Sequence, residues 1–399
     1  MGGSEYSGYE DFERAVKLNR ISLGLMGLWP TTRQNSREKL MCNLRVLVIF
    51  LVIITSLLIP SVYSLIITHS DLMQVVDNLQ FIVPTVNSVI KIMIFWWKKK
   101  AIATIINMMI EDWLRSKSTK ERNAMVRNAV IARAIIAFAY CLMGLAYVFI
   151  IVLPIFGISI RCLTNITDAG RSMPIQTYYI YDVTKTPQYE LTYIMISISV
   201  FCAMTCYAGI DNFLGLVVFH ICGQLDFLRH RFLRMNKFMN FHTILKSCVR
   251  DHMRLLRAIA VVEDIYNIIF LALFLCFGLL FSFYGFLIIN LLAKENDVSI
   301  TRLVYLISNV INIFGHMCLH CAIGEILMAQ CDKIYYAVYS QEWYILESSE
   351  ARDLIPVIIK SRKPVYLTAG KVFPITMATF CSLIKTSAGY ISVLLRMSV

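Results

Sequence analysis

Two histidines and one acid inside the apolar runs of the chain are the first residues that could do chemistry. His316 and His320 are four residues apart, so on a helix both would lie on one face, at the spacing of two metal ligands. No third ligand repeats the pattern, and hydrogen bonds within a helix bundle account for the pair without an ion. Asp211 lies in another apolar run, where a charge is costly unless it is paired or functional. A structural ion pair and a role in transport both stay open for Asp211, and we expect no metal and no other cofactor.

The sequence lacks the motifs of the common enzyme classes. It contains no GxxxxGK[ST] or GxGxxG phosphate loop and no GxSxG nucleophile turn. Four further histidines lie along one basic segment, 220–261, and none of them has HxxxH or HExxH spacing: His220, His230, His242 and His252. We therefore predict that the protein is not an enzyme.

The last apolar run, 371–397, carries a polar stripe. On a helical wheel with about 100° per residue, one set lies within about 100° of Val393: Ser382, Lys385, Thr386, Gly389, Ser392, Arg396 and Met397. A polar stripe in a membrane faces either a partner helix or water. In the second case the pore and gate positions are Ser382, Thr386, Gly389, Val393, Arg396 and Met397, with Val393 and Met397 as an apolar constriction.

The elements that could hold these residues are long apolar helices. Of the 399 residues, 58% are hydrophobic and 16% are charged, whereas a soluble domain carries about 25% charged residues. Seven runs can cross a hydrocarbon core about 30 Å thick, and each must be helical to satisfy its backbone in lipid. They cover residues 41–67, 73–97, 129–158, 189–219, 262–292, 303–330 and 371–397. The predicted fold is an all-α membrane protein with seven transmembrane helices.

The distribution of basic residues predicts the orientation. The segments 1–40, 98–128, 220–261 and 331–370 contain 27 Lys and Arg residues, and the segments on the other side contain 6. The positive-inside rule places the richer set in the cytoplasm, so we expect a cytoplasmic N-terminus and an extracellular C-terminus. The one N-x-Ser/Thr sequon, at Asn165, falls in a predicted external loop, and we expect a glycan on Asn165.

The cytoplasmic segments complete the predicted organisation. Residues 349–363 have the pattern of an amphipathic helix, with Ser349 as its cap and an apolar face formed by Leu354, Ile355, Ile358 and Ile359. We expect a single seven-helix transmembrane domain over 1–399. Its parts are a cytoplasmic N-terminal segment at 1–40, a cytoplasmic helical anchor region at 220–261 and 331–370, and a pore-lining helix at 371–397.

A succession of short motifs lies near the C-terminus. It comprises Lys360-Ser361-Arg362-Lys363-Pro364, Leu367-Thr368-Ala369-Gly370-Lys371, Phe380, Lys385-Thr386-Ser387, Tyr390 and Leu394-Leu395-Arg396. This succession resembles the C-terminal signature of the insect odorant receptor family, in its ligand-tuned form, and Gly324-Glu325 adds weaker similarity upstream. The chain departs from the family at Ala388-Gly389-Tyr390-Ile391, where members often have an aromatic pair or Ser-Tyr-Phe.

The resemblance implies an odorant receptor subunit of a ligand-gated, non-selective cation channel in the plasma membrane of olfactory sensory neurons. It also implies a heterotetramer with the olfactory co-receptor, and a pocket for a volatile or apolar odorant in the outer halves of the second, third, fourth and sixth spans. Within that region, depth and helical face select Leu79, Val83, Asn87, Met143, Tyr147, Ile150, Tyr193, Ile196, Val200, Leu306 and Val310 as ligand-binding candidates.

Two other classes of seven-helix protein are alternatives. A G-protein-coupled receptor needs an external N-terminus, which the charge pattern opposes, and the sequence has no DRY or NPxxY element. A secondary transporter predicts helix breaks in paired positions, whereas Pro84 is the one clear interior breaker. The basic residues gather between apolar runs, so we expect membrane lipid and not nucleic acid as a partner.

Overall fold

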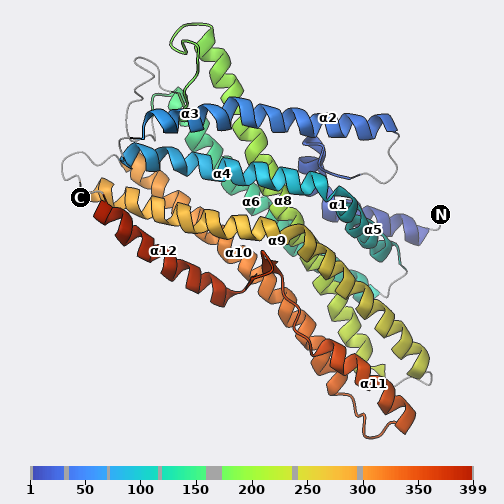
Figure 1. The fold of residues 1–399 in the computed structure, drawn as a ribbon. Coiled ribbons are helices and arrows are strands. Elements are labelled where there is room, and N and C mark those ends of the chain that lie inside the picture. The colour runs from blue at the N-terminus through green and yellow to red at the C-terminus, as the bar shows by residue number, and fades with distance from the viewer. Residues whose placement is uncertain are drawn as a thin grey trace.

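The computed structural model is a bundle of long helices (Figure 1). It describes residues 3–30, 36–69, 72–115, 119–158, 173–235, 241–293 and 300–397. Asn165 lies outside the described residues, as does the side chain of Met397.

The elements in chain order are α1 (Gly3–Leu25), α2 (Ser36–Ile53), the π-helical turn η1 (Ile54–Leu58), α3 (Ile59–Ile67), α4 (Leu72–Trp97), α5 (Lys99–Leu114), α6 (Thr119–Tyr147), the π-helical turn η2 (Val148–Val152), α7 (Leu153–Ile155), α8 (Gln188–Leu233), α9 (Phe241–Ala293), α10 (Ile300–Tyr339), α11 (Ser348–Ser361), β1 (Thr368–Ala369), β2 (Phe373–Pro374) and α12 (Met377–Met397).

Among the described residues, seven helical stretches are long and apolar enough to cross a membrane. They are Ser36–Ile67, Leu72–Trp97, Arg122–Ile155, Gln188–Leu233, Phe241–Ala293, Ile300–Tyr339 and Met377–Arg396. This confirms the predicted seven-helix membrane fold. The two termini lie at opposite ends of the bundle, as an odd number of crossings requires (Figure 1).

Two helices run far beyond the predicted spans. α8 has 46 residues and α9 has 53, so at about 1.5 Å per residue they are roughly 70 and 80 Å long. In the described part of the segment 220–261, the end of α8 and the beginning of α9 therefore supply the helical structure. Together with the end of α10 and with α11, they form the narrow extension at the lower right of Figure 1.

Prolines account for the two π-helical turns. A proline has no N–H, so the carbonyl four residues before it loses its helical partner. η1 precedes Pro60, and η2 precedes Pro154. In the first case the hydroxyl of Tyr179 donates to the free carbonyl of Ser56 over 2.8 Å. Both turns widen their helices next to the cavity described below.

The final helix begins later than the predicted residue 371. Gly370 and Lys371 have left-handed φ angles of 60° and 61°, which Gly adopts without strain. These angles turn the chain between β1 and β2, where Ala369 pairs with Phe373. Helix α12 starts only after this hairpin, at Met377, so residues 371–376 do not belong to it.

The amphipathic helix α11 is present, but its cap is Glu347 and not Ser349. The side chain of Glu347 and that of Glu350 form a reciprocal capping box, which satisfies two free N–H groups of the first turn. Leu354 and Val357 are buried against the chain, whereas Ile355 and Ile359 are 52% and 60% exposed. The predicted apolar face is therefore divided between an inner side and an outer side.

A buried charge cluster joins three helices near the basic segments. The carboxylate of Asp112 in α5 lies 3.0 Å from Nε2 of His220 in α8 and 2.6 Å from a guanidinium nitrogen of Arg254 in α9. Burial raises the pKa of Asp112, but the hydrogen bond of His220 and the charges of His220 and Arg254 outweigh it, so the pKa lies below its usual value. An ionised Asp112 holds the three helices together.

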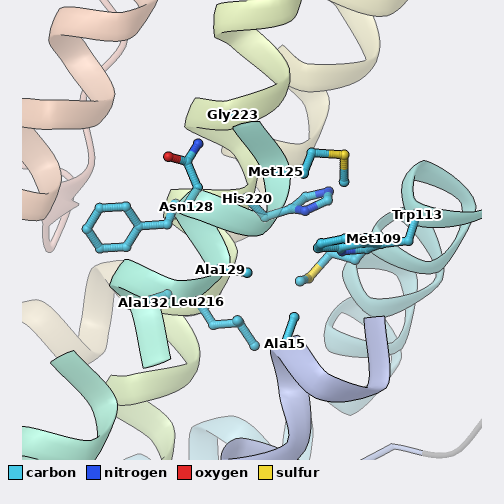
Figure 2. A pocket seen from close by; sticks show the side chains of 11 residues that line it. Ala15, Met109, Trp113, Met125, Asn128, Ala129, Ala132, Leu216, His220 and Gly223 are labelled. Atoms are coloured by element: carbon cyan, nitrogen blue, oxygen red, sulfur yellow. The ribbon is translucent and has the colours of Figure 1, made fainter. Parts of the chain in front are cut away.

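A small cavity lies beside this cluster, between α1, α5, α6 and α8. Figure 2 shows Ala15, Met109, Trp113 and His220 around it. Its volume is about 20 Å³, which is room for one water molecule. It is a gap in the packing and too small for an organic ligand.

Candidate functional site

A much larger cavity of about 940 Å³ lies within the bundle. Residues of α4, α6, η2, α8, α9 and α10 line it, together with Leu57 of η1 and Ile175 of the segment before α8. Along α10 the lining extends from Tyr305 to Ile323, a rise of about 27 Å. Small-molecule pockets usually measure about 300–1,000 Å³. The cavity is thus large and long enough for an extended organic molecule.

The lining is mainly apolar and comes from helices that are far apart in the sequence. Phe81 of α4, Phe149 of η2 and Phe277 of α9 contribute aromatic rings, and α6 contributes mostly aliphatic side chains. Polar groups from Gln80, Tyr305 and other residues occur at intervals. An apolar cavity with few polar groups is typical of a site for a small hydrophobic ligand.

The ligand-binding candidates divide into two groups. Three of them, Met143, Ile150 and Val200, line the cavity. The other eight do not line it: Leu79, Val83, Leu306 and Val310 pack in one apolar cluster, Tyr147, Tyr193 and Ile196 pack in a second, and Asn87 is buried in α4.

A buried ion pair lies at the wall of the cavity. The ammonium of Lys91 in α4 is 2.8 and 2.6 Å from the two carboxylate oxygens of Asp211 in α8. The Lys91 side chain is fully buried, and that of Asp211 is 6% exposed. The same ammonium lies 3.2 Å from the centre of the Tyr207 ring, within cation–π range. The structure therefore brings Asp211 into a pair that neutralises it.

The two histidines of α10 belong to the same cluster. Nε2 of His316 is 2.8 Å from Oδ2 of Asp211. Nδ1 of His320 is 2.8 Å from the backbone carbonyl of His316, and Nε2 of His320 is 3.8 Å from Oδ1 of Asp211. Both rings and Asp211 line the cavity, so the cluster is a polar patch in a mainly apolar wall.

A third donor for a metal, from another helix, lies beside the two histidines. Asp211, His316 and His320 offer ligand atoms within 4.8 Å of one another, and two histidines with one carboxylate suit a divalent transition metal. However, Lys91 already binds both oxygens of that carboxylate. A metal ion would have to displace this ammonium or add two positive charges beside it, so we continue to expect no metal.

Sequence reasoning singled out Asp211, His316 and His320 but missed Lys91 and Tyr207. A signal for Lys91 exists, because it is a lone base within the predicted span 73–97. A charge there needs an opposite charge on another helix, and Asp211 is the acid at a comparable place in the fourth span. No comparable signal exists for Tyr207, whose ring is one of many aromatic side chains in the spans.

Helix α12 presents the pore candidates on its outer side. Ser382, Thr386, Gly389, Val393 and Arg396 are all exposed, and Val393 is 53% exposed. The side facing the chain carries Phe380, Leu383 and Ser387, whose carbonyl accepts a hydrogen bond of 3.1 Å from Ser282 of α9. Nothing in the described chain covers the polar stripe.

Comparison with known proteins gives a consistent picture. The family described as 7tm Odorant receptor matches residues 71–388. Odorant receptor 85b of Drosophila melanogaster is 23% identical over 405 residues, which cover 96% of this chain and 99% of that one. Odorant receptor 10 of Aedes albopictus and odorant receptor 13a of Drosophila melanogaster are each 23% identical to this chain. These two matches span 54% and 56% of this chain, and only 57% of each relative.

Solved structures show a similar fold. The insect olfactory receptor OR5 from Machilis hrabei, in complex with eugenol, superposes with a TM-score of 0.83 at 16% sequence identity. That superposition covers 99% of this chain and all of the other. A second structure of the same receptor gives a TM-score of 0.82 at the same identity. At this identity, the likeness establishes the arrangement of the helices.

Proposed function

The chain belongs to the insect odorant receptor family, and on this premise we propose that it is a subunit of a ligand-gated, non-selective cation channel. A volatile or apolar small molecule binds in the 940 Å³ cavity and opens a pore lined by α12. The observation that carries the proposal is that α9 and α10, which line the cavity, pack directly against α12, whose polar stripe is exposed. Such a link is what a ligand needs to shift a closed–open equilibrium.

The first link is aromatic. Phe277 of α9 lines the cavity, and its ring centre is 5.8 Å from that of Phe380 in α12. Phe380 also lies 4.9 Å from Phe314 of α10. A ligand that moves α9 or α10 at the cavity therefore also moves the aromatic side chains that pack against α12.

The second link holds the start of α12. A carboxylate oxygen of Glu325 in α10 accepts the backbone N–H of Met377 over 3.0 Å, which caps the first turn of α12. The neighbouring Gly324 allows the carbonyl of Ile375 to approach α10, because a Cβ at 324 would lie 2.4 Å from that oxygen. Gly324 and Glu325, directly after the cavity-lining stretch of α10, thus contact the segment in which α12 begins.

Replacing Gly324 by alanine tests the contact between α10 and Ile375. The new methyl group would force apart α10 and the segment before α12, at a cost of about 1–3 kcal/mol. We expect the ligand-evoked current per receptor at the cell surface to fall several-fold. Gly144→Ala is the control, since a Cβ at 144 meets no atom within 4 Å. An equal effect of both substitutions would show that the contact with Ile375 does not transmit the signal.

The pore itself requires further subunits. One α12 cannot enclose a channel, and its polar stripe would be costly against lipid. In a heterotetramer with the olfactory co-receptor, four such stripes surround a water-filled axis. In this arrangement the basic segments and α11 are cytoplasmic, the C-terminus is extracellular, and the complex lies in the plasma membrane of olfactory sensory neurons.

The outer side of α11 is the place where we expect the co-receptor to dock. Exchanging Ile355 and Ile359 for aspartate would bury charge in that contact, which opposes assembly. Both side chains are exposed in the single chain, so its unfolding temperature should stay near that of the native protein while co-purification with the co-receptor is lost. Leu354 is 1% exposed, and Leu354→Asp should instead destabilise the chain itself. Normal assembly of the double variant would remove α11 from the interface.

The function is tested by recording currents with and without the co-receptor across a panel of volatile compounds. We expect ligand-evoked, non-selective cation currents only from the co-expressed pair. A G-protein-coupled receptor would act through G proteins without the co-receptor, and a secondary transporter would give coupled flux without channel openings. Either of those results would overturn the proposal.

A further inference from the structure

We propose that the cavity takes molecules that combine an apolar body with a neutral hydroxyl head group, and that Nε2 of His320 accepts the hydroxyl hydrogen. This inference names the ligand class of the site and rests on the proposed function for its physiological meaning. Its physical basis is the hydrogen-bonding state of the polar cluster at Asp211.

The tautomer of His320 follows from its backbone contact. A carbonyl oxygen can only accept, so Nδ1 of His320, 2.8 Å from the carbonyl of His316, must carry a hydrogen. In the neutral ring, Nε2 then has a free lone pair. The ring is 3% exposed and packs edge-on against Phe270, and the nearest acid, Asp211, is already paired with Lys91.

The neighbouring groups do not satisfy this lone pair. Nε2 of His320 faces Oδ1 of Asp211 at 3.8 Å, and a carboxylate oxygen is another acceptor. The donors of the cluster are directed elsewhere: Lys91 donates to both oxygens of Asp211, and Nε2 of His316 lies 2.8 Å from Oδ2. At Nε2 of His320 and Oδ1 of Asp211 the wall of the cavity therefore presents two acceptors side by side, which a hydrogen-bond donor fits and an ether or carbonyl oxygen does not.

The buried charges of Lys91 and Asp211 restrict the class of ligand further. An ammonium head group would place a second cation beside Lys91, and a carboxylate would place a second anion beside Asp211. Because these groups are buried at 0% and 6% side-chain exposure, either charge would be poorly solvated. A neutral hydroxyl adds no charge, and alcohols and phenols are the volatile compounds that carry one.

The rest of the cavity lining determines the kind of apolar body that the ligand can have. From His320 the cavity continues along α10 toward Tyr305 between largely apolar side chains, such as Phe81, Met143 and Phe149. An alkyl chain or a substituted ring can occupy this length while the hydroxyl reaches Nε2 of His320.

The experiment compares matched pairs on the full-length protein in lipid nanodiscs: 1-octanol with its methyl ether, and 4-ethylphenol with its methyl ether. Binding is followed by thermal stabilisation over a concentration series. We expect each hydroxyl compound to bind about 3- to 10-fold more tightly than its ether, the difference that one hydrogen bond makes. Equal affinities within both pairs would overturn the inference.

Three variants locate the effect. His320→Phe keeps a ring but removes the acceptor, so the preference for the hydroxyl compound should vanish. His320→Gln supplies a carbonyl acceptor and should restore part of it. Ile313→Val, at an apolar cavity residue of the same helix, should change both members of a pair in parallel. Since each result is a ratio within one variant, differences in the amount of folded protein cancel. A preference that persists in His320→Phe would refute the assignment.

Currents from the co-expressed pair separate this inference from the proposed function. If the hydroxyl preference appears in binding but no compound evokes a current, the channel proposal fails and the head-group inference stands. If compounds evoke currents without preference for a hydroxyl, the inference fails and the channel proposal stands.

Discussion

Neutralising Asp211 alone, in the variant Asp211→Asn, should destabilise the folded protein by about 3–5 kcal/mol, which is the usual effect of removing one partner from a buried pair. The reason is that Lys91 is 0% exposed and has Asp211 as its counter-ion at 2.6 Å. Without the carboxylate, an ammonium would remain inside the bundle with no opposite charge. Lys91→Met should have an effect of similar size, because it leaves Asp211 uncompensated.

The measurement is the unfolding temperature of the full-length protein in nanodiscs, together with the amount of receptor at the cell surface. The double variant Lys91→Met/Asp211→Asn removes both charges and should recover most of the lost stability. Lys98 and Asp264 provide a matched control, with the same 2.6 Å distance but side chains 34% and 51% exposed. Asp264→Asn should cost less than about 1 kcal/mol. Equal losses at the two pairs would mean that burial of Lys91 and Asp211 is not what makes their pairing important.

The variant Val393→Ser should raise the current that flows without ligand several-fold in the co-expressed channel. Val393 lies on the exposed polar stripe of α12 and, in the proposed pore, contributes to a narrow apolar ring. Such a ring stops ions because water is poorly held inside it, and a hydroxyl makes the closed pore easier to wet. Since co-receptor subunits supply the rest of the ring, one substituted subunit should change the basal current only in part.

Ala388→Ser adds the same hydroxyl to an exposed position on the other side of α12 and serves as the control. It should leave the basal current near its native value. Currents are compared per receptor at the cell surface, with single-channel recording to separate open probability from conductance. If Val393→Ser and Ala388→Ser behave alike, the stripe of α12 is a packing surface between subunits and not the wall of a pore.

The sequence by itself determined the class of fold and the family. Seven apolar runs suffice because a backbone in lipid can satisfy its hydrogen bonds only within a helix, and the observed helices lie where those runs are. The C-terminal motifs, from Lys360-Ser361-Arg362 to Leu394-Leu395-Arg396, were specific enough to identify the family. The amphipathic pattern of residues 349–363 also predicted α11, although its cap is Glu347 and not Ser349.

Only the tertiary structure decided which side chains meet inside the bundle. Lys91 and Asp211 are 120 residues apart, and the cavity lining comes from most of the spans at once. In a soluble protein, the apolar side of each helix would have shown its rotation toward the core. In a membrane, the lipid-facing side is as apolar as the side facing other helices, so a single span carries little information about its rotation. For this reason helical face and depth led to Met143, Ile150 and Val200 at the cavity, but also to Tyr193, Ile196 and Leu306, which are packed elsewhere.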